Sequence, residues 1–99
     1  MATLRVLLHA PTAEALARAR LNARNLSHAR PDAEVLIIAN AGAVAAALAS
    51  ADATDPLLRL CRNSLTAQGL DNARGLAEVE AAVVTLAERQ LEGWAYLRA

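Results

Sequence analysis

The sequence predicts an α/β fold in which a five-stranded, mostly parallel sheet carries helices on both faces. Short apolar runs alternate with longer segments in which apolar residues recur every three or four positions. The run Glu34 to Ala39 is apolar on both faces, which is typical of a strand inside a parallel sheet. No linker or low-complexity stretch interrupts the chain, so we expect one domain over residues 1–99.

The first half of the chain predicts two strands separated by a helix. Residues 4–9 form a mostly apolar strand that ends at Ala10 and Pro11. Thr12 is suited to cap the following helix, and Pro31 disfavours helix at the residue before it. The helix spacing predicts a buried stripe made of Leu16, Ala19, Ala23 and Leu26.

The second half predicts three further helices, each followed by a strand. In the helix over 83–92, the spacing of Val83, Leu86, Ala87 and Leu91 predicts one buried face, and Gly93 closes the helix. Trp94 and Tyr96 are expected in the core or in an interface. The expected helices are 43–50, 64–68 and 83–92, and the expected strands are 57–61, 76–81 and 94–97.

Right-handed crossovers through five strands favour the flavodoxin-like strand order 2-1-3-4-5. In that order the first and third strands are neighbours. Ligands bind beyond the carboxyl ends of these two strands, at the point where the strand order reverses. The residues expected at those ends are His9, Asn40, Cys61, Arg62, Asn63 and Ser64. The predicted order therefore gathers these polar groups on one rim.

Composition excludes several classes of partner. The ten basic residues are all arginine and are balanced by ten acidic residues, so we expect no broad surface for nucleic acid or anionic membranes. No apolar run approaches the ~18 residues of a membrane span. About a quarter of the chain is alanine, which buries little area. We therefore expect a soluble, cytoplasmic, self-associating protein.

Cys61, the single cysteine, lies at the predicted junction of a strand and a short helix. A helix N-terminus beside Arg62 favours a thiolate. His9, at the end of the first strand, is expected to act as a base or to orient the thiol. The alternatives remain a buried packing cysteine and a histidine satisfied by local hydrogen bonds.

Asn63 and Ser64 are expected to cap the third helix, or to present backbone amides to an anion. Asn40 is expected to form the turn after the second strand and to lie at the binding rim.

The residue spacings that several other kinds of active or binding site require are absent from this sequence. The sixth residue after Cys61 is Ala67 and not arginine, which argues against a cysteine phosphatase. A single cysteine cannot form an internal disulfide or a C-x-x-C motif. Neither G-x-G-x-x-G nor a Walker-type loop occurs, and the two histidines and one cysteine show no ligand spacing. We therefore expect no metal and no cofactor.

Five segments together carry a resemblance to a known family. They are the strand ending in His9, residues 21–26 (Leu-Asn-Ala-Arg-Asn-Leu), residues 35–42, residues 61–65 (Cys-Arg-Asn-Ser-Leu) with Gly69, and residues 90–97. In order and spacing the chain resembles the DsrE/DsrF-like family of small α/β proteins. The resemblance implies a trimer or hexamer and a link to sulfur trafficking. It also implies that Cys61 would accept sulfane sulfur as a persulfide and pass it to a partner protein.

Two functions are therefore open. In the first, the protein is a sulfur carrier or sulfurtransferase-like protein: a Cys61 thiolate holds a persulfide, His9 assists the thiol, and the amides of Asn63 and Ser64 stabilise the anion. In the second, it is a non-catalytic oligomeric module that binds a small anion or a protein partner at the same crevice. The reactivity of the sulfur discriminates between the two.

Overall fold

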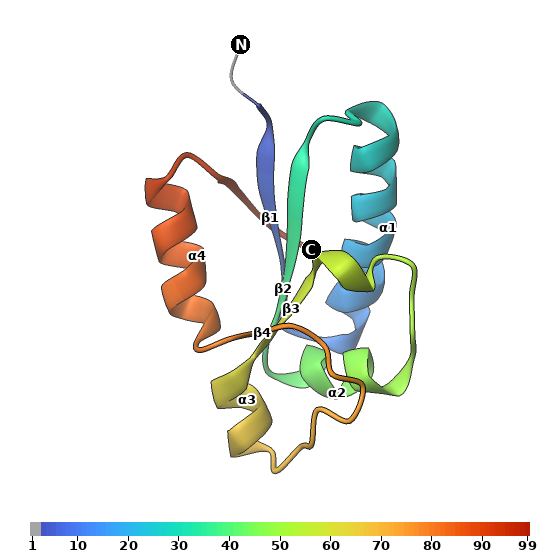
Figure 1. The fold of residues 1–99 in the computed structure, drawn as a ribbon, viewed down its shortest axis with the longest axis vertical. Coiled ribbons are helices and arrows are strands. Elements are labelled where there is room, and N and C mark those ends of the chain that lie inside the picture. Colours follow the sequence, from blue (N-terminus) through green and yellow to red (C-terminus); the bar gives the residue numbers. More distant parts are fainter. Residues whose placement is uncertain (1–2) are drawn as a thin grey trace.

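The computed structural model describes residues 3–99, which form a five-stranded sheet with helices on both faces (Figure 1). The strands are β1 (Arg5–Ala10), β2 (Glu34–Ala39), β3 (Leu58–Cys61), β4 (Glu78–Val79) and β5 (Ala95–Arg98). The α-helices are α1 (Ala13–Ala29), α2 (Gly42–Ala49), α3 (Arg62–Ala67) and α4 (Ala82–Leu91), and Asp55–Leu57 form a 3₁₀ turn. The α/β class and the order of elements are confirmed, and the predicted fourth strand is much shorter than expected.

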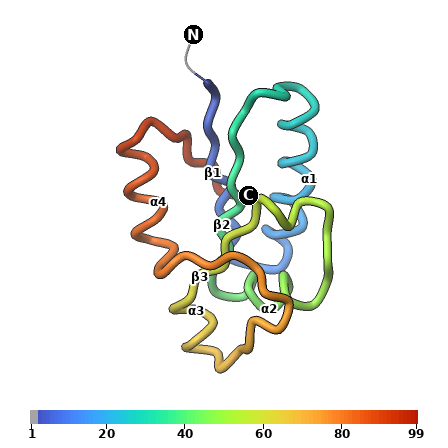
Figure 2. Tube along the Cα trace, viewed as in Figure 1, coloured from blue at the N-terminus to red at the C-terminus, as the bar shows by residue number. Residues whose placement is uncertain are grey.

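The strand order corrects the sequence prediction. The sheet runs β4-β3-β2-β1-β5 with all neighbours parallel, so the predicted order 2-1-3-4-5 is wrong. β2 lies between β1 and β3, and β5 pairs with the other edge of β1. The tube in Figure 2 shows β5 returning beside β1 after the chain has passed through β4 and α4. The reversal of strand order therefore falls between β1 and β5.

Close packing between α1 and α2 explains this order. Both helices lie on the same face of the sheet, and their alanines share one core with the sheet, together with Leu16 and Val44. A Cβ added to Gly42 would come within 3.8 Å of the Pro11 carbonyl oxygen, so α2 begins close beside the start of α1. In the order 2-1-3, right-handed crossovers would put α1 and α2 on opposite faces. The small side chains favour the observed arrangement, because they let the two helices approach closely.

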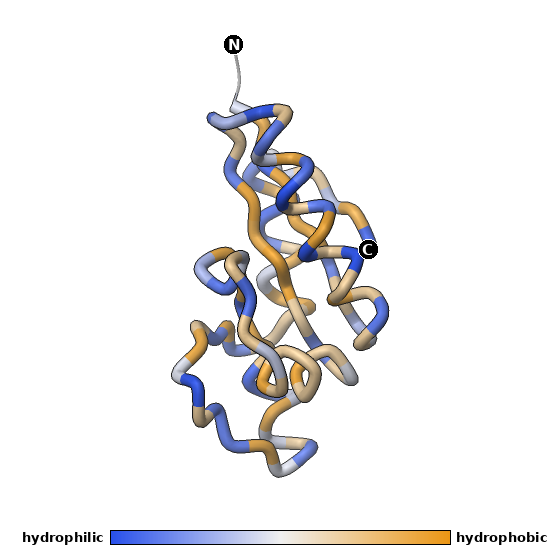
Figure 3. The backbone as a smooth tube through the Cα atoms, turned by 90° about the vertical axis from the view of Figure 1, so that its right-hand side faces the viewer, coloured by the Kyte–Doolittle hydropathy of each residue, from blue (hydrophilic) through white to orange (hydrophobic). Residues whose placement is uncertain are grey.

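The opposite face of the sheet packs against α4. Its core contains Leu7, Ile38, Cys61 and Ala82, with Leu86 and Trp94 packed at the margin. The predicted buried face of α4 is therefore wrong in part, because Val83 is 74% exposed and Leu91 is 90% exposed. The hydropathy colouring in Figure 3 shows hydrophobic stretches along the strands and mixed colours along the helices. We call the two sides of the sheet the α1 face and the α4 face.

α1 begins and ends where the sequence predicts. Thr12 has extended backbone geometry, and its hydroxyl accepts a hydrogen bond from the Ala15 amide at 3.0 Å. Leu16, Ala19 and Ala23 are buried, as the spacing predicts. Pro31 follows the C-cap Arg30, which agrees with the predicted end. Within residues 3–99, no helix has both the length and the apolar character needed to cross a membrane.

The turn between β2 and α2 contains a strained residue. Ala41 has φ 48° and ψ −128°, a backbone conformation that residues other than glycine rarely adopt. Contacts from α3 and its C-cap hold it there: the Ala41 amide donates to Ser64 Oγ at 3.0 Å, and Gln68 Nε2 donates to the Ala41 carbonyl at 2.9 Å. The turn and α3 therefore stabilise one another.

We predict that Ala41→Gly stabilises the protein by about 1 kcal/mol, because removing the Cβ relieves backbone strain that exceeds the added unfolded-state entropy. Ala45→Gly is the control, since Ala45 lies exposed in the middle of α2 and should lose about 1 kcal/mol. The free energy of unfolding in urea measures both variants. Equal destabilisation by the two substitutions would contradict the inference that the backbone is strained at Ala41.

A cluster of charged residues fixes the connection between α2 and β3. Asp52 accepts hydrogen bonds from the Thr54 amide at 3.0 Å and the Thr54 hydroxyl at 2.5 Å, and it pairs with Arg24. The Thr54 hydrogen bonds and the Arg24 contact lower the pKa of Asp52 to about 2. Asp55 bonds Arg74 Nη2 at 2.5 Å, which ties the loop after α3 to this connection. The cluster lies at the amino end of β3, away from the carboxyl ends of the strands.

We predict that stability falls as the pH drops from about 4 to about 2. A carboxyl whose pKa is lowered on folding stabilises the protein above its unfolded pKa, and that stabilisation disappears as it is protonated through its folded pKa. Urea unfolding from pH 2 to pH 7 measures the effect, which is on the order of 1–2 kcal/mol for Asp52.

Asp52→Asn should flatten this pH dependence. Asp32→Asn, which removes an exposed carboxylate, should leave it unchanged. Parallel pH profiles for wild type and Asp52→Asn would refute the assignment to Asp52.

Candidate functional site

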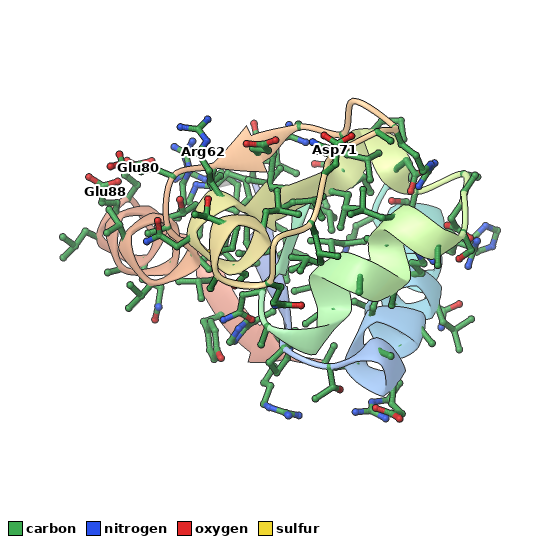
Figure 4. The ribbon with its side chains drawn as sticks, turned by 90° about the horizontal axis from the view of Figure 1, so that it is seen from below. Arg62, Asp71, Glu80 and Glu88 are labelled. Carbon is green, nitrogen blue, oxygen red and sulfur yellow. The ribbon has the colours of Figure 1, made fainter. Side chains whose placement is uncertain are left out.

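The carboxyl ends of the strands hold all the residues that the sequence singled out, and Figure 4 views the molecule from that end. His9 is near the end of β1, Asn40 follows β2, and Cys61 ends β3. Strand alternation and register put all three on the α4 face. They form two separate groups, one around the thiol and one around the imidazole.

The Cys61 thiol lies beneath the start of α4. The residue is 5% exposed, and its sulfur accepts a hydrogen bond from the Ala82 amide at 3.4 Å. Burial raises the pKa of the thiol. Hydrogen bonding by the Ser64 hydroxyl and by the Ala82, Ser64 and Asn63 amides lowers the pKa by more than burial raises it, so the net shift is downward. The surroundings therefore favour the thiolate although the sulfur is nearly shielded from water.

Ser64 connects the thiol to the strained turn. Its oxygen accepts the Ala41 amide proton at 3.0 Å, which leaves the hydroxyl proton free to point at Cys61. The turn thus orients the donor that stabilises the thiolate. The predicted role of Ser64 as a helix cap is wrong, because the N-cap residue is Cys61 and Ser64 lies in the first turn of α3.

Asn63 also lies inside the helix and does not cap it. Its amide donates to the Glu80 carbonyl at 3.3 Å and also helps to lower the pKa of the Cys61 thiol. This shared donor joins the segment before α4 to the start of α3. The predicted side-chain cap by Asn63 is therefore wrong, and stabilisation of an anion by its amide stays a prediction.

Arg62 does not support the thiol in the way that the sequence suggested. Its Nε donates to Glu78 Oε1 at 2.9 Å, and its side chain is 59% exposed. Figure 4 shows Arg62 on the same outer side as Glu80 and Glu88. Arg62 is not among the groups that shift the pKa of Cys61. The thiolate is favoured by hydrogen bonds and not by the neighbouring guanidinium.

His9 is held by two side chains from the neighbouring strands. Its Nε2 is 2.9 Å from Asn40 Oδ1, and its Nδ1 is 2.6 Å from the Tyr96 hydroxyl. The imidazole and phenol ring centroids are 5.7 Å apart with an interplanar angle of 48°. We call these three residues, from β5, β1 and the end of β2, the His9 chain.

The structure does not bring His9 to the thiol. β2 separates β1 from β3, so two strand spacings, about 10 Å, lie between the two backbones. Both ring nitrogens already have partners, which leaves neither free to take the thiol proton. The expected pairing depended on β1 and β3 being adjacent, and that adjacency is absent.

Tyr96 is the functional candidate that the sequence did not reveal. Its aromatic ring suggested a core or interface residue, but it is 39% exposed and bonds His9. The register of β5 against β1 aligns Tyr96 with Leu7 on the α4 face, two positions before His9. The sequence offers no such signal unless β5 is already known to pair with β1.

An open cavity of about 560 Å³ lies between α3 and the loop that leads to β4. Its lining includes Arg62, Thr66, Asp71 and Glu78, but Cys61 and His9 are not part of it. This cavity is thus separate from both the thiol and the imidazole. No set of three or more potential metal-ligating side chains comes together within residues 3–99.

Comparisons with known proteins did not identify a family. No model of a protein family matches the chain, and no curated protein matches it either.

We predict that Ser64→Ala raises the pKa of the Cys61 thiol, because the thiolate loses its hydroxyl donor. The rate of iodoacetamide alkylation, measured against pH, should shift to higher pH and fall several-fold at neutral pH. Ser64→Thr, which keeps the hydroxyl, should restore most of the rate. Thr66→Ala is the control, since it removes an exposed hydroxyl from the same helix. An unchanged Ser64→Ala profile would remove Ser64 from this role.

Proposed function

We propose that the protein is a DsrE/DsrF-like carrier of sulfane sulfur that holds a persulfide on Cys61. The observation that carries the proposal is the position of the Cys61 sulfur, which accepts a hydrogen bond from the Ala82 amide at 3.4 Å and whose pKa is lowered by the Ser64 hydroxyl and by the amides of Ser64 and Asn63. A thiolate is the nucleophile in sulfur exchange. The donors keep the thiolate form accessible although the site is almost fully buried.

The loading step is a simple exchange at sulfur. The Cys61 thiolate attacks the terminal sulfur of a donor persulfide, a new S–S bond forms on Cys61, and the S–S bond of the donor breaks. The donor leaves as a thiolate and takes up the proton that its persulfide carried. A second thiolate, on an acceptor protein, reverses this exchange and removes the sulfur. No oxidant is consumed in either step.

Access to the sulfur requires movement at the start of α4. Cys61 is 5% exposed and lies against Ala82, which is the buried residue of α4. Other residues of α4, among them Val83, Val84 and Leu91, are exposed, so the helix is held to the sheet by a narrow strip of contacts. Displacement of residues 80–82 would uncover the thiol at modest cost.

Assembly with further copies of the chain is part of the proposal, and the resemblance favours a trimer or hexamer. The exposed apolar residues support it, because α4 and β5 leave Leu91 90% and Leu97 54% accessible. β5 is also an edge strand that is exposed along its whole length. Edge strands and apolar surfaces of this kind are commonly covered by another chain.

The burial of Cys61 also favours a second function, in which the protein is a non-catalytic module that binds an anion or a protein partner. In that case the thiol packs against Ala82 and does not react. The two proposals differ in the chemistry of one atom. They share the fold and the carboxyl ends of the strands.

We predict that intact-mass spectrometry detects the gain of one sulfur after incubation with a low-molecular-weight persulfide. The gain should be reversed by reductant, absent from Cys61→Ser, and faster than on a free thiol at equal total thiol concentration and neutral pH, because hydrogen bonds that lower the pKa of Cys61 raise its thiolate fraction. The chain has one cysteine, so any added sulfane sulfur maps to it. Ser64→Thr serves as the folded variant that keeps the donor.

A gain no faster than that of the free thiol would favour the binding module. Sedimentation equilibrium of the same samples tests the assembly, and a monomer mass at micromolar concentration would contradict it.

A further inference from the structure

We propose that the His9 chain, together with Arg98, binds a small oxyanion and takes up one proton as it does so. This site is independent of the thiol, because β2 separates it from β3 and Cys61 takes no part in it. It lies where the strand order reverses, between β1 and β5. Open parallel sheets commonly bind ligands beyond the strand ends at such a point.

The hydrogen bonds fix where the protons lie. Asn40 Oδ1 is an acceptor, so Nε2 of His9 must carry a hydrogen. In the neutral imidazole, Nδ1 is then an acceptor, and the Tyr96 hydroxyl must donate to it across 2.6 Å. The phenol proton therefore points inward. The outward side of Tyr96, which is 39% exposed, presents an oxygen that can only accept.

Protonation of His9 reverses this polarity. In the imidazolium both ring nitrogens donate, Nε2 to Asn40 and Nδ1 to the Tyr96 oxygen. The phenol proton is then released to point outward, where it can donate to a ligand. The site thus changes from an acceptor into a hydroxyl donor with a cation behind it. An anion with acceptor oxygens selects the protonated state.

Arg98 supplies a positive group in addition to the His9 imidazolium, beside the His9 chain. It is paired with His9 in the register of β5 against β1, so both side chains lie on the α4 face. Its side chain is exposed and donates to the Ala99 carbonyl at 3.1 Å. Among residues 3–99, no Asp or Glu side chain forms an ion pair with Arg98. The contact with the Ala99 carbonyl uses one of the five N–H donors of the guanidinium. A guanidinium on the same face as a hydroxyl donor is suited to an oxyanion.

The other charged groups on this face do not neutralise the site. Arg5 donates to the Glu92 carbonyl, and Glu92 itself pairs with Arg89 at 2.9 Å. Figure 4 shows Glu88 on the outer side of α4, next to Glu80. α2 carries no ionisable side chain. The ionisable groups on the α4 face of the sheet and on α4 are Arg5, His9, Glu34, Arg59, Cys61, Glu88, Arg89, Tyr96 and Arg98. Glu34 is paired with Arg5 in the register at the amino ends of β1 and β2, away from His9.

Titration calorimetry with sulfate tests the proposal, because sulfate keeps its charge across the pH range in which histidine titrates. Binding is measured between pH 5.5 and 8.5 in two buffers of different ionisation enthalpy, which gives the number of protons taken up. We expect uptake to approach one proton per sulfate at the alkaline end. The affinity should fall there by about tenfold per pH unit, as the linkage of one proton requires.

Four variants separate the parts of the site. His9→Gln and Tyr96→Phe should abolish proton uptake, whereas Arg98→Gln should weaken binding at every pH and keep the uptake. His28→Gln is the matched control, since it removes the other histidine of the chain. Absence of sulfate binding, the same affinity at pH 5.5 and 8.5, or proton uptake that persists in His9→Gln would each overturn the proposal. Circular dichroism and unfolding in urea establish that each variant is folded.

Discussion

The position of β2 between β1 and β3 is the constraint on which the arrangement of the site depends. β2 is hydrogen-bonded on both sides and buried on both faces, so it cannot leave the centre of the sheet without exposing Ile37 and Ile38. Because β2 lies between β1 and β3, Cys61 and His9 are two strand spacings apart. The carboxyl end of β2, however, contacts both: Asn40 bonds His9, and the next residue, Ala41, bonds Ser64 beside the thiol.

The turn after β2 therefore links two groups that differ in chemistry. On one side, the Ala41 amide orients a hydroxyl that donates to sulfur, and the backbone amides of α3 and α4 complete a set of donors that favours negative charge. On the other side, the Asn40 oxygen fixes the tautomer of His9 and, through it, the proton of Tyr96. Adjacent residues thus support a thiolate and an imidazole. The strain at Ala41 is the local cost of this geometry.

Local signals in the sequence predict the elements well because they need no knowledge of neighbours. The apolar run from Glu34 to Ala39 matches β2, and Thr12 and Pro31 bound α1 as their side chains require. The strand order was missed because it depends on which face α2 takes. That choice is made by contacts between alanines of α1 and α2 that no periodicity displays.

The same limit explains the errors within the site. The pattern of α4 contains two apolar stripes, and the helix buries the one with Ala82 and Leu86 and leaves Val83 and Leu91 in solvent. The sequence correctly brought Cys61 and Ser64 to the strand ends, but it paired the thiol with Arg62, whose guanidinium instead bonds Glu78. Tyr96 became a candidate only when β5 was found beside β1. Long-range pairing, and not local propensity, decides these contacts.

The start of α4 has two opposing effects on the thiol. The Ala82 amide donates to the sulfur and so favours the thiolate, while the Ala82 side chain and backbone cover it. If this segment moved away as proposed, the sulfur would become accessible but would lose one of its hydrogen-bond donors, which would raise the pKa of the thiol. The Ser64 hydroxyl is anchored to Ala41 and not to α4, so it would stay beside the sulfur after such a movement. In the proposed sulfur carrier, the thiolate that meets a sulfur donor would therefore be stabilised mainly by the turn after β2, and α4 in its observed position would shield a persulfide on Cys61.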